Sequence, residues 1–197
     1  MGAFGDNLHK PALALAESLG LADEQVDSLS SLGLYINYNG YGPSIEDLHF
    51  DPQALYLKLY EAGSPLDFVS NSPDFEKLKH GYRQDMGLAE ALQPMHEGPG
   101  IAVFTLPDEA WARRVSGVYS NDLATSNPQR AHAVLTEKAN GNYLVSVRAP
   151  LSNKQGAAQL CMQFDTGGGR AAAAGINDLP TDKLDAFVAA FSLAYSS

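Results

Sequence analysis

Apolar residues in the first half of the chain recur every three or four positions, which is the spacing of α-helices. The first stripe predicts a helix from Asn7 to Leu19 that ends at Gly20. Its members are Leu8, Ala12, Leu15 and Leu19. A second stripe runs from Val26 to Ile36. Asp51-Pro52 and Ser72-Pro73 are typical helix starts, because a side-chain acceptor precedes a proline. The helix after Ser72-Pro73 is predicted to be the longest in the chain.

Short apolar runs and alternating patterns in the second half predict β-strands. Ile101–Leu106 is an apolar run that ends at a proline, whereas Ala131–Thr136 and Tyr143–Ala149 flank the hairpin signature Asn140-Gly141. Arg148 lies on the more polar face of the second hairpin arm. Three helical patterns alternate with the strands. The first begins at Asp108, the second spans Gly156–Phe164, and the third follows Pro180-Thr181. This alternation predicts an α/β fold, with a helical N-terminal part and a mixed sheet flanked by helices.

Charge is distributed unevenly along the 197 residues. The net charge of −10 resides entirely in residues 1–99, which contain 5 basic and 15 acidic residues, whereas residues 100–197 contain 8 of each. This shift in composition predicts a domain boundary at Pro99-Gly100, with domains at 1–99 and 100–197. An acidic surface repels phosphates and makes general nucleic-acid binding unfavourable, although a local basic site in the neutral half stays open.

The remaining composition favours a cytoplasmic protein. Cys161 is the single cysteine, so no internal disulfide can form, and its apolar helical position favours a buried small residue over a nucleophile. The N-terminus lacks the pattern of a secretory signal, and no apolar run is long enough to cross a bilayer.

The stretch Phe164–Asn177, FDTGGGRAAAAGIN, is the strongest candidate for chemistry. It satisfies the loose dinucleotide-binding pattern, but no βαβ unit and no acidic residue at the required distance follow it. A phosphate loop of the Walker type needs a Gly-Lys-Ser/Thr sequence, which is absent. Both of these interpretations are therefore rejected.

Two interpretations of the glycines remain. In the first, they form a turn before an alanine helix that packs closely on a sheet. In the second, backbone N–H groups of Gly167–Gly169 and the start of that helix bind an oxyanion, and the guanidinium of Arg170 adds a bidentate contact. Arg113, Arg114 and Arg148 are further candidates, although single arginines are commonly solvated or in surface ion pairs.

The order of these motifs resembles the DHH-associated domain, which ends the DHH phosphoesterases. These include RecJ-like exonucleases, nano-RNases and cyclic-dinucleotide phosphodiesterases. In the family, a strand with Ser-x-Arg precedes a GGGH-x-x-A-A-G loop, and both face substrate phosphates. Ser146 and Arg148 match the strand, and Gly167–Gly169 and Ala173–Gly175 match the loop. The resemblance implies that Ser146, Arg148, Gly167, Gly168, Gly169 and Arg170 bind substrate phosphate, with Arg113 or Arg114 assisting.

Arg170 departs from the family pattern, which has histidine at this place. An arginine grips phosphate but does not readily shuttle a proton. The chain is also similar to a bacterial branch of the superfamily in which arginine occupies the position. Members of that branch are labelled acetyltransferase or exopolyphosphatase-like. A glycine-rich loop suits the pyrophosphate of coenzyme A, but no other feature supports a transferase.

Gly2–Asp6 resembles the G-x-x-x-D element that closes the family's catalytic domain, whose aspartate helps to bind a Mn²⁺ or Mg²⁺ pair. The alternative is that Asp6 caps the first helix. The Asp-x-Asp and Asp-His-His motifs that supply the other ligands are absent, and the five histidines are scattered. We therefore expect a truncated C-terminal portion of a phosphoesterase, inactive alone and without bound metal. Its expected partners are the missing catalytic domain and a nucleotide, a short oligonucleotide or polyphosphate. A non-catalytic binding module and a homodimer stay open.

Overall fold

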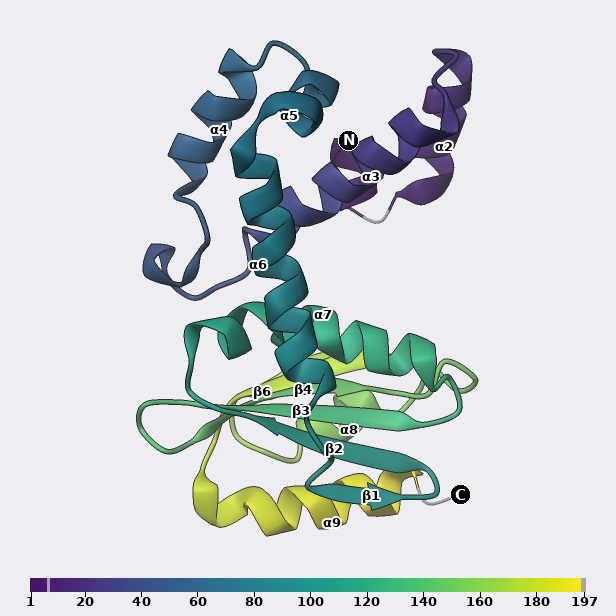
Figure 1. Ribbon diagram of the computed structural model, residues 1–197. Helices are drawn as coiled ribbons and strands as arrows, with labels where there is room; N and C mark the ends of the chain where they lie inside the picture. Colours follow the sequence, from purple (N-terminus) through teal and green to yellow (C-terminus); the bar gives the residue numbers. More distant parts are fainter. Residues whose placement is uncertain (7, 196–197) are drawn as a thin grey trace. The chain divides into compact units, whose positions relative to one another are not determined.

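The computed structural model describes residues 1–6 and 8–195 (Figure 1). Its internal contacts divide the chain into two units, Met1–Asp85 and Met86–Ser197. This division falls within one helix, whereas the shift in composition predicts a boundary at Pro99. Asn7, with which the first predicted helix begins, lies outside the described residues. None of the described helices is long and apolar enough to cross a membrane.

The first unit is helical, as its apolar spacing predicts. Its elements are α1 (Gly2–Gly5), α2 (His9–Ser18), α3 (Asp23–Tyr38), η1 (Ile45–Asp47), α4 (Pro52–Glu61), α5 (Pro65–Asn71) and the first part of α6 (Pro73–Glu90). With 18 residues, α6 is the longest described helix, as predicted. Asp51 caps α4, since its Oδ1 accepts from the Ala54 N–H at 2.9 Å. The Ser64-Pro65 pair gives the same start signal to α5, which the apolar spacing alone does not reveal.

The core of this unit gathers aromatic and aliphatic side chains from α3 to α6. A buried polar contact joins α3 to α6, because the Tyr38 hydroxyl donates to Asp85 Oδ2 at 2.6 Å. His49 Nε2 lies 3.2 Å from the same oxygen. A buried carboxylate requires such partners, so these two contacts fix α6 within the unit.

The apolar stripe of α2 is largely uncovered. Only its alanine, Ala12, is buried, whereas Leu8, Leu15 and Leu19 are 53%, 60% and 64% exposed. The periodicity therefore predicts the helix correctly, but the described residues do not cover its apolar face. Contiguous exposed apolar side chains of this kind commonly mark an interaction surface.

The second unit is built on a six-stranded mixed sheet of order β1-β2-β3-β4-β6-β5. The strands are β1 (His96–Gly98), β2 (Ile101–Leu106), β3 (Ala131–Glu137), β4 (Tyr143–Arg148), β5 (Gly167–Arg170) and β6 (Ala173–Leu179). β2 and β3 are parallel, and every other pair is antiparallel. The hairpin predicted at Asn140-Gly141 joins β3 to β4. These features confirm the α/β class and the mixed sheet.

Helices cover both faces of this sheet (Figure 1). α8 (Ala157–Cys161) and α9 (Leu184–Tyr195) cover one face, where Val145, Val147 and Ile176 are fully buried with Phe187 and Phe191. α7 (Ala110–Ser126) lies across the opposite face. There the rings of Phe104 and Tyr119 meet edge to face at 5.6 Å. The layered arrangement leaves alternate residues of each strand facing α7 or α9.

The alanine helix predicted after the glycines is wrong, because Ala173–Leu179 is the strand β6 and pairs with both β4 and β5. The intrinsic helix preference of alanine is weak enough for this tertiary pairing to override it. The helical pattern that begins at Asp108 also predicts that this aspartate caps the helix, and this is wrong. Glu109 occupies the N-cap position of α7 without a side-chain hydrogen bond, and Asp108 contacts Arg113 instead.

Close packing of α1 on α3 generates the first prediction. An added Cβ at Gly33 would lie 2.5 Å from the Met1 carbonyl oxygen, whereas one at Gly87 on α6 would meet nothing within 4 Å. We expect Gly33→Ala to lower the free energy of unfolding by about 1–3 kcal/mol through overpacking. The matched Gly87→Ala variant should raise it by up to about 1 kcal/mol through helix propensity. Urea denaturation followed by circular dichroism measures both, and equal stability of the two variants would refute the packing argument.

Candidate anion-binding site

The three consecutive glycines lie on β5, and each has different surroundings. An added Cβ at Gly167 would lie 1.8 Å from the Cys161 carbonyl oxygen. Gly169 has a φ of +143° and would clash with the Cα of Ala174 at 2.5 Å. Packing and backbone conformation therefore explain these two glycines. Gly168 has open space around it, with nothing within 4 Å of an added Cβ. The fold does not explain its lack of a side chain.

Strand register brings the predicted phosphate ligands of β4 and β5 onto one face. Arg148 pairs with Ala173, which pairs with Arg170 on its other side. In the next row, Ser146 pairs with Gly175, which pairs with Gly168. Since Val145 and Val147 point into the core under α8 and α9, these two rows face the opposite way.

Small residues separate the two arginines. In the strand register Ala173 lies between them and, one row away, Gly175 and Gly168 pair, so this part of the sheet carries almost no side-chain bulk. Gly175 is required by packing, since an added Cβ would lie 2.6 Å from the Val145 carbonyl oxygen. We call Ala173, Gly175 and Gly168 the floor of the site, and Arg148 and Arg170 flank it in the strand register.

Arg148 is held in place by neutral acceptors. Its Nε donates to Asn121 Oδ1 on α7 at 2.8 Å. Its Nη1 donates to Ser146 Oγ at 3.0 Å and to the Val147 carbonyl oxygen at 3.2 Å. Among the described residues, no carboxylate forms an ion pair with Arg148 or Arg170. Guanidinium groups that no described carboxylate contacts are the kind of donor that phosphate and carboxylate ligands use, so this pair is the candidate anion-binding site.

The electrostatics of the site agree with this arrangement. Burial, together with the positive charge of Arg170, lowers the pKa of Arg148. The shift means that the charged form of Arg148 is disfavoured by its surroundings. A bound phosphate or carboxylate would relieve both causes, since it would replace lost hydration and screen the two cations from each other.

His132 lies beside Arg148 in the strand register but does not contribute charge. Its ring is buried, and burial, with a smaller effect from Arg130, lowers its pKa to about 4. His132 is therefore neutral at physiological pH. Its Nδ1 has no hydrogen-bond partner among the described residues.

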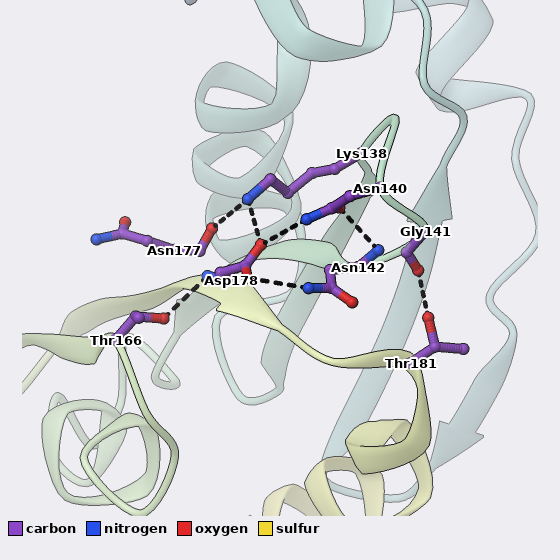
Figure 2. A network of polar contacts seen from close by, with 8 residues as sticks. All are labelled: Lys138, Asn140, Gly141, Asn142, Thr166, Asn177, Asp178 and Thr181. Carbon is purple, nitrogen blue, oxygen red and sulfur yellow. Dashed lines mark hydrogen bonds and ion pairs between the residues drawn. The ribbon is translucent and has the colours of Figure 1, made fainter.

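A polar network anchors the far end of the β5–β6 hairpin (Figure 2). The Asp178 carboxylate accepts from Lys138 Nζ, from Asn142 Nδ2 at 2.9 Å and from Asn140 Nδ2 at 3.4 Å. The bond from Lys138 is the main reason why the pKa of Asp178 is lowered. The Asp178 N–H donates to Thr166 Oγ1 at 2.9 Å, and Thr166 has a φ of +62°. These contacts fix the residue at which β5 begins.

Arg113 and Arg114 lie away from this site. They lie in the first turns of α7, seven and eight residues before Asn121, which corresponds to about 10–12 Å of helix. Arg113 Nη1 contacts Asp108 Oδ1 at 2.5 Å. The structure therefore gathers Ser146, Arg148, Gly168 and Arg170 but does not bring the two helical arginines into the same rows.

Asp6 follows α1 as its C-cap residue, and Leu8 is the N-cap of α2. The alternative role predicted for Asp6, as the cap of that helix, is therefore wrong. Within residues 1–6 and 8–195, no three histidine, cysteine, aspartate or glutamate side chains lie close enough to hold a metal ion. The helix N-terminus predicted to help bind the anion is also absent, because Arg170 is followed by β6.

Asn121 is the residue of this site that the sequence does not reveal. It is an exposed amide on α7, and it belongs to no motif that marks it as a ligand. Its contact with Arg148 follows only from the packing of α7 across β4, which brings together positions 27 residues apart.

Comparisons with known proteins show a shared fold. No protein-family model matches the chain, and no curated protein matches it. The structure is similar to the pGpG-specific phosphodiesterase PggH from Vibrio cholerae, with a TM-score of 0.56 and 15% identity. The match covers 74% of this chain and 51% of PggH. CDC45 from Entamoeba histolytica gives a TM-score of 0.52 and 10% identity, with 85% of this chain and 38% of that chain covered. RecJ from Thermus thermophilus, solved in complex with Mg²⁺, gives a TM-score of 0.47 at 15% identity, over 92% of this chain and 36% of RecJ.

This chain thus spans about half the length of PggH and less than half of CDC45. At these identities the likeness concerns the fold. It agrees with the resemblance to DHH phosphoesterases at that level.

The buried, neutral His132 generates a prediction about pH. Since its folded pKa of about 4 lies below its ordinary value near 6.5, the unfolded chain binds a proton first as pH falls. Its contribution should leave stability unchanged above about pH 6.5 and reduce it by roughly 3 kcal/mol between there and pH 4. Chemical denaturation at several pH values measures the slope, and His132→Gln should flatten it. The exposed His96→Gln on β1 is the control, and an unchanged slope in His132→Gln would contradict the prediction.

Proposed function

We propose that this chain is the phosphate-binding substrate portion of a DHH-type phosphoesterase that acts on nucleotides, short oligonucleotides or polyphosphate. The observation that carries the proposal is the pair Arg148 and Arg170, which share one face of the sheet across a floor of small residues and form no ion pair with a carboxylate of residues 1–6 and 8–195. The fold shared with a phosphodiesterase supports the same class of substrate. Neither the fold nor the site favours the acetyltransferase label.

In this proposal the chain's own residues bind and orient the substrate. Arg148 and Arg170 would each donate N–H groups to phosphate oxygens, and Gly168 would let a phosphate approach the strand closely. The Ser146 hydroxyl accepts from Arg148 Nη1 and would help to hold the guanidinium in its direction. Arg170 replaces a histidine of the family pattern, and its planar guanidinium would offer phosphate a bidentate contact.

Catalysis would need a metal pair from another domain. Asp6 is the candidate ligand that the family resemblance indicates, and two divalent ions require several carboxylates or histidines. Mn²⁺ or Mg²⁺ would therefore be bound largely by a catalytic domain that the described residues do not include. When bound, the metals would supply an activated water and stabilise the leaving oxygen, while this chain would hold the phosphate in line.

Calorimetric titration with a 5′-phosphorylated trinucleotide tests the proposal, in the absence and presence of Mn²⁺. We expect binding without metal, with affinity reduced about 10- to 100-fold in Arg148→Ala and Arg170→Ala, because each removes charged hydrogen bonds. Arg170→Lys should lose part of the affinity, since the charge stays and the bidentate geometry goes. Affinity should fall as salt rises.

The matched control is Lys183→Ala, which removes an exposed positive charge of the same unit outside the candidate site. Its affinity should equal that of the wild type. Folded wild-type protein that binds no phosphorylated ligand would refute the substrate-binding role. Hydrolysis of the trinucleotide by this chain alone with Mn²⁺, at the rate of an intact phosphoesterase, would refute the need for another domain.

A further inference from the structure

The contact between Asn121 and Arg148 has an unusual chemical character. The guanidinium is half-buried, and a partly desolvated cation is ordinarily stabilised by a carboxylate. Here its Nε meets an amide oxygen at 2.8 Å, and its Nη1 meets a hydroxyl and a carbonyl oxygen. All three acceptors orient the group, and none of them neutralises it.

This turn of α7 tolerates an acidic residue, so the helix itself does not require a neutral side chain at position 121. The next residue, Asp122, is a carboxylate, and its charge helps to raise the pKa of Tyr119 to about 12, after the larger effect of burial. An aspartate at position 121 differs from asparagine by one oxygen in place of an NH₂ group. It would present a charged acceptor at the position from which the amide oxygen now contacts Nε.

We propose that Asn121 is a positioning residue whose neutrality keeps the charge of Arg148 available for an anionic ligand. This inference rests on the proposed phosphate-binding function. Asn121 fixes the direction of the guanidinium through Nε, and the anion supplies the missing negative charge. A carboxylate at this position would act as an internal competitor, because it would occupy the guanidinium and repel the ligand.

The test exploits opposite effects on stability and on binding. In Asn121→Asp, the new ion pair compensates the charge of Arg148, so the midpoint of thermal unfolding should rise. The same change should weaken binding of the 5′-phosphorylated trinucleotide about tenfold or more. In Asn121→Ala, both quantities should fall, because orientation is lost and no charge is gained. A residue with a purely structural role would move stability and affinity in the same direction in both variants.

Asn127→Asp is the matched control. It adds the same charge at the end of the same helix, at an exposed residue whose side chain has no hydrogen bond to Arg148. Its affinity should stay within about twofold of the wild type. Equal affinity of the wild type and Asn121→Asp would overturn the proposed role of Asn121 while leaving phosphate binding intact. If the wild type binds no trinucleotide, the proposed function fails and the role of Asn121 fails with it. A midpoint that does not rise in Asn121→Asp would show that the charge of Arg148 is already compensated, which also overturns the inference.

Discussion

An arginine charge held by neutral acceptors is the interaction on which the candidate site depends. Three hydrogen-bond acceptors orient the Arg148 guanidinium: the side-chain amide of Asn121 on α7, the hydroxyl of Ser146 on the same strand and the backbone carbonyl of Val147. Burial and the proximity of Arg170 make this charge costly to maintain. Proteins commonly tolerate such local costs where a ligand completes the arrangement. Strand register places this charge, and the small residues of β5 and β6 keep the space beside it clear.

Strand register places the two arginines on one face of the sheet. Arg148 and Arg170 are on strands that do not touch, and β6 aligns them because Ala173 pairs with both. A shift of one residue in either pairing would turn one arginine towards the core. The network around Asp178 opposes such a shift at the far end of the hairpin, where Thr166 accepts the positive φ that begins β5. The site is thus kept in register by contacts that do not touch it.

Local signals explain how much could be read from the sequence. The cap at Asp51 and the turn at Asn140-Gly141 act over a few residues, so the helices and the hairpin they define are predictable. The polar face of β4 with Arg148 is also visible as an alternation. The strand conformation of the alanine stretch is not visible, because it depends on pairing with β4, where Ala173 and Ala174 pair with Arg148 and Val147. The role of Asn121 likewise follows from the packing of α7 across the sheet. The exposure of the apolar face of α2 is a matter of tertiary packing, which periodicity along the chain does not report.

β5 is an edge strand, and its composition bears on how the sheet behaves among other molecules. Unpaired edges offer hydrogen-bonding groups to foreign strands and promote aggregation. A four-residue edge with three glycines and a terminal arginine gives an incoming strand almost no side chains to pack against, and glycine itself disfavours strands. The lack of side chains that would make room for a small anion therefore also weakens the pairing of a foreign strand with this edge. A sheet can in this way leave one edge open to solvent and to solutes without becoming a template for fibrils.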